Sequence, residues 1–416
     1  MRARIPTRHE TKIEMNKDIV ARDEHDARMP RRDFLRKSLL LALPATFGGM
    51  ATSALAATMS SPLPASLSTT ALFNPPSRTR GSTEISVRTF GAYGDAVHDD
   101  TAAFQRAIDA LPSGGGTVAV PAGTYVIDPT VMVRLRSSMH LRLADGAVLK
   151  AKANAADRAY VLMLHKVSDV EISGGEIEGD RDRHLATTGQ WGHGIMVRGA
   201  SRVTIRDMLI RKCWGDGISI AATTDVPKVI SVDIVVSNVA CVQNRRQGMS
   251  IGQARGVKVY DSEFSYTSGI TPGCGIDIES DYENPGAANT HIENCLIRYN
   301  QGNGIQVYRR TNGTTIKRNV IEFNQGYGVL TIGAVTGYIG YNEIRNNDLI
   351  GVGIRASSSD YAVGQNYFYN NARRYRSYDM PKLSPAVART GNVLPRHTEV
   401  ANSTNIRINT NYYYDK

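Results

Sequence analysis

The chain has 416 residues, and its 41% hydrophobic and 21% charged residues are typical of a globular protein rather than a mainly disordered one. Lysine and arginine number 49 against 39 aspartates and glutamates, and the net charge of +10 favours an anionic partner such as nucleic acid, a membrane surface or an acidic polysaccharide. Only one stretch, near residues 38–57, is apolar enough to insert into a membrane, and a single stretch excludes a polytopic membrane protein.

Residues 1–57 have the organisation of an export signal. Arg31 and Arg32 precede Phe34 and Leu35, an apolar run follows, and Ala-Leu-Ala at 54–56 suits cleavage. The paired arginines resemble a twin-arginine signal, whose substrates cross the membrane already folded through the Tat translocon. We expect a periplasmic or secreted protein rather than one with a stable membrane anchor, because the apolar run is short and interrupted. Residues 58–83, rich in Ser, Thr, Pro and Ala, are predicted to be a linker.

Residues 84–128 are predicted to cover the open end of the fold that follows. Asp99, Asp100 and Thr101 can begin a helix that runs through Ala110. We assign Asp95, Asp99 and Asp100 a structural role here. The apolar face of the helix contains Phe104, Ala107 and Ile108.

A repeat dominates the rest of the chain. Each copy reads apolar-x-apolar, a polar turn, another apolar residue and then Gly-Ile-x-Ile, as in residues 203–220, 234–251, 290–307 and 314–331. Successive copies lie 23–33 residues apart, which is typical of a solenoid. The apolar position that recurs in every copy is Ile177, Ile210, Cys241, Phe264, Ile297, Ile321 and Ile344.

This repeat predicts an all-β fold, a single-stranded right-handed parallel β-helix with an N-terminal capping helix. No amphipathic helical pattern separates the strands, which disfavours leucine-rich or βαβ architecture. A β-sandwich needs hairpins and Greek-key crossovers, and the fixed template argues against it. We place the β-helix at 84–394, with its cap at 84–128, and a C-terminal tail at 395–416.

Stacking of the copies also explains the positions of several asparagines and of the cysteines in the repeat. Asn244, Asn300 and Asn324 each lie four residues before the Gly that opens the next strand, so we expect a side-chain hydrogen-bond ladder. Cys241 occupies the inward column among isoleucines, and Cys213, Cys274 and Cys295 lie in other columns. We therefore predict four free thiols, and no zinc spacing is present.

The segments VRTFGAYGD, DDTAAFQRAID and GGGTVAVPAGTY closely resemble the N-terminal module of the pectate lyase/rhamnogalacturonase/epimerase-like superfamily. With the repeats, the resemblance covers roughly residues 84–370 and implies the β-helix fold. It leaves the reaction open, because that superfamily includes hydrolases, lyases, epimerases and phage tailspikes. The paired Asp-Asp of polygalacturonases and the Asp-Pro-His motif of mannuronate epimerases are absent, so neither catalytic set is transferred.

Two coils carry insertions before the Gly-Ile strand and two carry insertions after it, which predicts a walled groove over that strand. Its floor is formed by the outward residues of successive coils. These are Met196 and Arg198, Ser219 and Ala221, Ser250 and Gly252, Asp277 and Glu279, and Gln306 and Tyr308. The small residues leave room for a sugar ring.

Asp277 and Glu279 are the strongest candidates for chemistry. They lie two residues apart on one strand, so their Cα atoms are ~6.6–6.8 Å apart. This suits the acid and base of an inverting glycosidase, whose carboxyl groups are ~6.5–9.5 Å apart. Close like charges also raise one pKa, as a general acid requires. The alternative is a solvated acidic strand face.

Other residues are expected beside this pair. His193 and Asp216 occupy stacked positions and form either a base with its orienting carboxylate, which makes Asp216 a catalytic candidate, or a polar turn pair. Trp191 stacked over Trp214 forms either a sugar platform or turn packing. Asp180 and Asp182, with Asp281 and Glu283, could hold Ca²⁺, but no Ca²⁺-loop spacing supports it, so no metal or other cofactor is assigned. The candidate substrate-binding residues are Arg198, His193, Tyr308, Arg246, Asp180, His184, Trp191 and Trp214.

We thus expect an exported enzyme, most simply a glycoside hydrolase acting on an acidic or mixed polysaccharide. A polysaccharide lyase or uronate epimerase is the first alternative, with Arg198, His193, Tyr308 and Arg246 as its parts. A glycan-binding β-helix without catalysis is the second. Nucleic acid is not an expected partner, because the basic residues form no stripe with interleaved aromatics. A monomer is expected.

Overall fold

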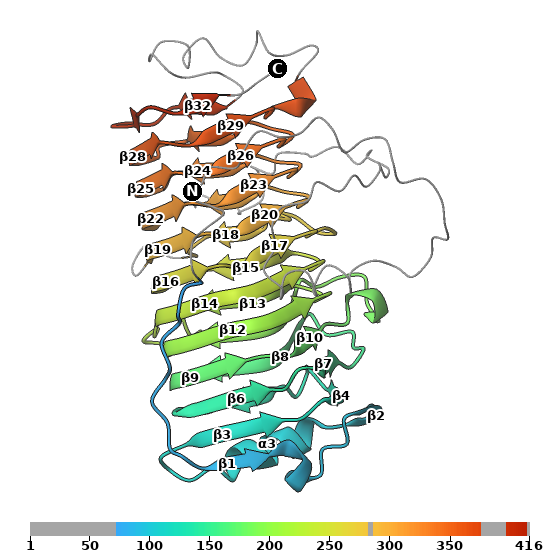
Figure 1. The fold of residues 1–416 in the computed structure, drawn as a ribbon. Coiled ribbons are helices and arrows are strands. Elements are labelled where there is room, and N and C mark those ends of the chain that lie inside the picture. The colour runs from blue at the N-terminus through green and yellow to red at the C-terminus, as the bar shows by residue number, and fades with distance from the viewer. Residues whose placement is uncertain (1–71, 282–285, 376–396, 414–416) are drawn as a thin grey trace, which may run out of the picture.

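The computed structural model describes residues 72–281, 286–375 and 397–413. In these ranges the chain winds into a right-handed parallel β-helix, whose strands stack coil upon coil (Figure 1). All the pairings between named strands are parallel, as the repeat predicted. The export signal predicted at 1–57 lies outside the described residues.

The strands form two sheets, of ten and of 22 strands, which we call sheet B and sheet A. Sheet B contains one strand per coil and carries the Gly-Ile repeat. Its members are β5 (Val133–Leu135), β8 (Arg158–His165), β11 (Trp191–Arg198), β13 (Asp216–Ala221), β15 (Gln247–Ile251), β18 (Ile276–Ile278), β21 (Ile305–Val307), β24 (Val329–Ile332), β27 (Val352–Arg355) and β30 (Thr398–Ala401).

Sheet A contains two columns of strands, which follow each other along each coil. The first column is β1 (Glu84–Ser86), β3 (Gly116–Val120), β6 (Met139–Leu143), β9 (Ser168–Ser173), β12 (Ser201–Arg211), β14 (Ser231–Val242), β16 (Ala254–Tyr260), β19 (Ala287–Glu293), β22 (Thr311–Lys317), β25 (Val335–Gly340), β28 (Ser359–Gly364) and β31 (Arg407–Ile408). Strands β12 and β14 are long enough to continue into the second column. The rest of that column is β2 (Asp95–Asp99), β4 (Gly123–Ile127), β7 (Ala147–Ala151), β10 (Glu176–Glu178), β17 (Glu263–Ser265), β20 (Leu296–Arg298), β23 (Val320–Glu322), β26 (Glu343–Arg345), β29 (Tyr367–Tyr369) and β32 (Tyr412–Tyr413).

The corner between the two columns depends on one residue per coil with a left-handed backbone. Asp207, Asn238, Asp261 and Asn294 occupy this position with φ values of 58°, 53°, 54° and 56°. Asp and Asn tolerate this conformation better than other residues with a side chain, since their short polar groups can bond locally. These residues therefore let the chain turn without a long loop.

The core contains the apolar column that the repeat identified. Ile177 pairs in register with Ile210, which pairs with Cys241, and the column continues through Phe264 and Ile297. It goes on through Ile321 and Ile344, and all seven side chains are fully buried. The four cysteines are buried free thiols, as expected.

Two asparagine ladders run through the turns. Asn300 donates to Asn324 (2.8 Å), which donates to Asn347 (2.9 Å), and this confirms the predicted ladder for those two residues. Asn244 lies in the same column but bonds the backbone of Cys213 and Ile210 instead.

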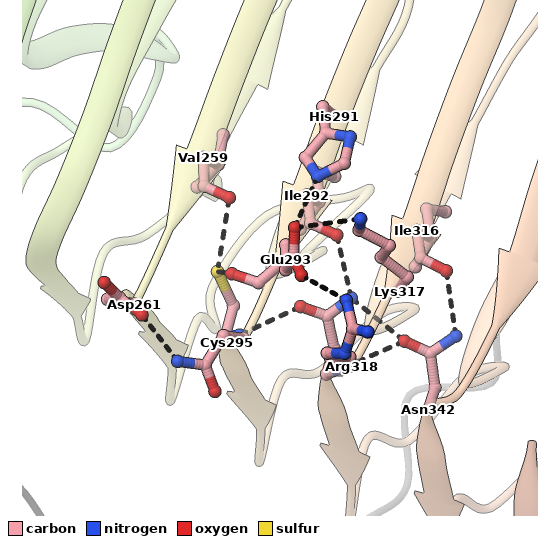
Figure 2. Close-up of polar contacts among 12 residues, drawn as sticks. Val259, Asp261, His291, Ile292, Glu293, Cys295, Ile316, Lys317, Arg318 and Asn342 are labelled. Carbon is pink, nitrogen blue, oxygen red and sulfur yellow. Dashed lines mark hydrogen bonds and ion pairs between the residues drawn. The ribbon is translucent and has the colours of Figure 1, made fainter. Parts of the chain in front are cut away.

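The second ladder, which the sequence analysis missed, links Asn319, Asn342 and Asn366 with bonds of 3.0 and 2.9 Å. Figure 2 shows part of it, with Asn342 bonded to Ile316 at the right and the backbone amide of Cys295 at the left. Each amide also bonds a backbone carbonyl, so the ladder satisfies buried groups at every coil.

Helix α3 (Thr101–Asp109) lies at the N-terminal end of the stack, beside β1 (Figure 1). Its buried face contains Phe104, Ala107 and Ile108, as predicted, and it ends one residue before Ala110. Asp100 is the N-cap residue, but its carboxylate accepts from the backbone amides of Tyr93 and Gly94 rather than from the helix. Three short 3₁₀ helices complete the described secondary structure: η1 (Val87–Phe90), η2 (Arg181–Arg183) and η3 (Arg373–Tyr375).

The described part of the predicted linker is packed against the solenoid. Phe73 stacks on Tyr260 with centroids 3.9 Å apart. The buried guanidinium of Arg78 pairs with Asp233 at 2.7 Å and bonds Thr204 at 2.8 Å. Residues 72–83 therefore run along the coils of sheet A towards β1, so the linker prediction is wrong for them (Figure 1).

The predicted C-terminal tail also differs. Strands β30, β31 and β32 pair with β27, β28 and β29 in parallel, so residues 398–413 form one more coil. The sequence of this last coil lacks the Gly-Ile repeat, although its strands still pair with those of the preceding coil. Among the described residues, no helix is long and apolar enough to cross a bilayer.

Candidate functional site

The outward face of sheet B forms the floor of the candidate site, and its register is the one predicted. Met196 pairs with Ser219, Ser219 with Ser250, and Ser250 with Asp277. Asp277 in turn pairs with Gln306. Arg198 and Tyr308 are half-buried at the two ends of this floor, while Ala221 and Gly252 lie between them.

Asp277 is almost completely buried on this face. Its two carboxylate oxygens accept from the side-chain amides of Gln247 (2.8 Å) and Gln306 (3.1 Å). Burial, and then the charge of Glu279, raise the pKa of Asp277 to about 7, although Arg246 and Gln306 oppose the shift. Glu279 is exposed and follows the last residue of β18, Ile278, so the prediction that both carboxylates lie on one strand is wrong for Glu279. The two carboxyl groups therefore have different environments, which is how a site separates an acid from a base.

The amides of Gln247 and Gln306 are both held in position. The oxygen of Gln247 accepts from the backbone amide of Cys274 (3.0 Å), and that of Gln306 accepts from Asn303 (2.9 Å). Each NH₂ group is therefore directed to Asp277. The sequence analysis did not assign these two glutamines, although both occupy columns that it had identified.

Arg246 and Asp216 form an ion pair beside Asp277. One guanidinium nitrogen of Arg246 lies 2.9 and 3.1 Å from the carboxylate oxygens of Asp216, whose side chain is completely buried. The hydroxyl of Ser250 also donates to Asp216 (2.7 Å). Because Asp216 is enclosed and paired, its geometry suits positioning of Arg246 better than contact with a substrate.

His193 is stacked beside Asp216, as predicted, but it is buried. Its Nδ1 accepts the backbone amide of Asp216 (3.0 Å) and lies 3.5 Å from the carboxylate. Burial lowers the pKa of His193 to about 4, so the ring is neutral near pH 7. Its ring stacks on Tyr160 at 5.5 Å. This geometry favours the polar turn pair over a base with its orienting carboxylate.

The two tryptophans do not stack on each other as expected. Trp214 is 8% exposed, with His184 stacked on it at 4.0 Å and the guanidinium of Arg245 3.6 Å from its centroid. Trp191 pairs in register with Arg158, whose guanidinium lies 4.0 Å from the indole. The two indoles thus have different partners, and His184, from the insertion between β10 and β11, lies on Trp214.

Asp180 and His184 belong to this buried cluster rather than to an open groove wall. Asp180 accepts from the side chains of Asn154 (2.8 Å) and His184 (2.7 Å). Their side chains are 6% and 1% exposed, respectively. Substrate contact by either residue would need the cluster to open.

The described acidic residues that were considered as Ca²⁺ ligands do not form one cluster. Asp182 pairs with Lys212 at 2.6 Å, Asp180 pairs with His184, and Glu283 lies outside the described residues. Within the described ranges, no group of three or more His, Cys, Asp and Glu side chains could hold a metal ion.

Three family models match parts of the chain. Residues 84–171 match the model described as rhamnogalacturonase A/epimerase, pectate lyase-like, and residues 136–290 match the right-handed β-helix region. Residues 227–382 match the model of the periplasmic copper-binding protein NosD.

Curated relatives are similar over part of the chain. The uncharacterized protein YclG of Bacillus subtilis is 28% identical over 274 residues, which are 59% of this chain and 44% of YclG. The mannuronan C5-epimerase AlgE4 of Azotobacter vinelandii is 34% identical over 155 residues, 32% of this chain and 27% of that protein. The chain thus spans less than half the length of these relatives.

Solved structures share the fold. The A-module of Azotobacter vinelandii AlgE4 has a TM-score of 0.62 at 17% identity and covers 80% of this chain and 97% of that one. PfbA, a surface adhesin of Streptococcus pneumoniae, has a TM-score of 0.55 at 17% identity, with 80% and 92% covered. These similarities establish the β-helix fold.

Proposed function

We propose that the chain is a glycoside hydrolase that cleaves an acidic or mixed polysaccharide, with Asp277 as general acid and Glu279 as general base. The observation that carries this proposal is a buried carboxyl, whose pKa is raised to about 7, with an exposed carboxyl two residues along the chain, just past the end of β18.

The chemistry follows from the different environments of the two groups. Protonated Asp277 gives its proton to the glycosidic oxygen, and the bond to the anomeric carbon breaks. Glu279 takes a proton from water, whose oxygen bonds to that carbon with inversion. The amides of Gln247 and Gln306 then stabilise the Asp277 carboxylate that remains.

The substrate class is proposed from the charges around the floor. Arg198 and Arg246 lie on the same face as the acidic pair, and small residues between them leave space for a sugar. We propose that Arg198 and Tyr308, half-buried at the two ends, contact the chain of the polysaccharide. Arg246 is held by Asp216 and acts on the site through its charge.

A uronate epimerase or polysaccharide lyase is the second candidate, because a mannuronan C5-epimerase is 34% identical over 155 residues. Such enzymes remove the C5 proton with a base and neutralise a substrate carboxylate. His193 is buried and accepts a backbone amide, which disfavours it as that base. We therefore rank hydrolysis first.

We further propose that the protein is exported by the Tat system and acts in the periplasm or outside the cell as a monomer, without a metal or other cofactor. This proposal depends on the paired arginines at 31–32 and the apolar run after them. Isolation of the mature chain from a periplasmic fraction, and its loss when both arginines become lysines, would test it.

The decisive experiment incubates the purified protein with a panel of acidic polysaccharides and measures three products. New reducing ends indicate hydrolysis, ultraviolet absorbance of an unsaturated uronate indicates elimination, and a changed proton NMR spectrum without cleavage indicates epimerisation. Asp277→Asn and Glu279→Gln should each lower turnover by orders of magnitude while the fold persists. Chelation with EDTA should change nothing.

Wild-type turnover in either variant would remove that residue from the proposed pair. Elimination or epimerisation in place of hydrolysis would select the second candidate. Binding without any new chain ends, double bonds or epimers would indicate a glycan-binding protein instead.

A further inference from the structure

A cavity of about 780 Å³ lies where the chain turns from sheet B to sheet A, and neither Asp277 nor Glu279 lines it. Its charged lining residues are Arg255, Arg309 and Arg310, and no acidic side chain belongs to its described lining. Ala287 and Ala288 form part of its surface. A hollow with three guanidinium groups and small residues between them suits an anionic ligand.

The register explains why the hollow is continuous. Arg255 pairs with Ala288, Ala288 with Asn312, and Asn312 with Val335, so the lining follows one position through four coils. Coils lie about 4.8 Å apart, which gives a length of roughly 14 Å along the solenoid axis. Small side chains at several of these positions keep the surface hollow.

Two of the three arginines, Arg309 and Arg310, have contacts that hold them in place. One nitrogen of Arg310 donates to the backbone carbonyls of Ser280 (3.2 Å) and Asp281 (2.8 Å). The guanidinium of Arg309 lies 5.5 Å from the ring of Tyr308, and its stem packs against Gly333. Arg255 is exposed on β16, two coils away from Arg309, or about 10 Å along the axis.

The cavity adjoins the proposed reaction site. Tyr308, at the end of the site floor, directly precedes Arg309 in the chain. Arg310 bonds the two residues that follow Glu279. The cavity therefore lies next to the Tyr308 end of the floor, where a glycan chain bound on the floor would reach it.

We infer that this cavity binds the carboxylate groups of a uronate-containing glycan, with Arg255 and Arg309 taking carboxylates on different sugar units. Guanidinium groups bind carboxylates with paired, charge-assisted hydrogen bonds. The identification of the ligand as a glycan depends on the proposed function. It makes the polysaccharide substrate a polyuronate rather than a neutral glycan.

The test measures binding, independently of turnover, by isothermal titration calorimetry with the full chain. The probes are hexamers of galacturonate and of mannuronate, the same hexamers with their carboxyl groups reduced to alcohols, and a single-stranded DNA hexamer. The variants are Arg255→Gln and Arg309→Gln. Lys258→Gln is the matched control, because Lys258 is an exposed cation on the same strand as Arg255 but does not line the cavity.

We expect each arginine variant to weaken binding of at least one uronate hexamer by about tenfold, with little change for the reduced hexamer. Added salt should weaken wild-type binding and shrink the difference between wild type and variants. Lys258→Gln should bind like the wild type. Asp277→Asn should bind the uronate normally even where it fails to turn it over, which separates this inference from the proposed reaction.

Three results would overturn the inference. In the first, no uronate hexamer binds in a way that depends on Arg255 or Arg309. In the second, the reduced hexamers bind as tightly as the uronates. In the third, the DNA hexamer binds more tightly than any uronate, which would assign the cavity to nucleic acid.

Discussion

The coils that carry the candidate site and the coils beyond them share one strand register but differ in their buried polar groups. From the turn after β20 onward, asparagine ladders provide many of these groups, and most of their amides bond the copy one coil away. Between β11 and β21, the sheet B face instead buries Asp216 and Asp277, with the half-buried Arg246 paired to Asp216. Buried carboxylates on sheet A, such as Glu263 and Glu322, pair with arginines, whereas Asp277 accepts from two neutral amides. Burying a carboxyl is costly, and a raised pKa of this kind is typical of a functional site.

Turn length differs in the same way. The turn from β24 to β25 contains only Gly333 and Ala334, whereas residues 279–286 separate β18 from β19. Strand pairing fixes the register in both regions, so insertions and outward side chains are the parts that can vary without disrupting the core. In this solenoid the repeated strands therefore provide stability, whereas the insertions and the outward side chains provide function.

The largest effect is expected from filling the site floor. A Cβ at Gly252 would lie 3.4 Å from the nearest atom, the carbonyl oxygen of Ile220, which is ordinary contact, so Gly252→Trp should fold with an outward indole. We expect it to abolish cleavage or binding of polysaccharide. Arg355→Trp, at the equivalent outward position of a distal coil, is the control and should leave activity unchanged. Equal behaviour of the two variants would place the groove elsewhere.

Breaking the buried ion pair should be the next largest effect. Arg246→Met leaves the completely buried carboxylate of Asp216 without its cation, which should cost about 3–5 kcal/mol of unfolding free energy. The exposed pair of Arg202 and Asp169, whose atoms lie 2.6 Å apart, is the comparison, and Arg202→Met should cost less than about 1 kcal/mol. Urea denaturation measures both values. A similar cost for the two variants would contradict the assigned burial.

The protonation of Asp277 should make stability depend on pH. Its pKa of about 7 in the folded chain lies above the ordinary value of 3.8 in the unfolded chain. Below pH 4 the carboxyl is protonated in both states. Between pH 4 and 7 the unfolded chain loses this proton first, so stability falls, by on the order of 4 kcal/mol, and then levels off.

Asp277→Asn should remove this part of the pH dependence, as measured by thermal unfolding between pH 4 and 8. Turnover should also fall above pH 7, where the general acid has lost its proton. Parallel stability curves for wild type and variant would show that Asp277 ionises normally.

The smallest effect is expected in the regular coils. Asn324→Ala removes the bonds to Asn300 and Asn347 and leaves buried partners unsatisfied, which should cost about 2 kcal/mol. Turnover per folded molecule should not change, because the ladder lies away from the floor. A loss of turnover at full folding would mean that the ladder also positions the site.

Much of this protein is determined by its sequence alone. The column from Ile177 to Ile344 and the outward series from Met196 to Gln306 pair as the repeat predicts, because parallel stacking requires each residue to meet its copy. The ladder at Asn300 and Asn324 follows for the same reason. The free thiols were also predictable from the sequence, since the cysteines lie in different columns of the repeat.

Only the tertiary structure decided what lies between repeats. The burial of Asp216 and His193, and the enclosure of Trp214 by His184 and Arg245, depend on how turns fold over the sheet. Residues 72–83 and 398–413 lack the repeat, so no sequence signal indicated that the first would pack against distant coils and that the second would add a coil. The cavity lined by Arg255 and Arg309 arises from residues 54 positions apart in the chain, which a local pattern does not connect. A repeat specifies contacts between its own copies, whereas these features depend on contacts between unlike segments.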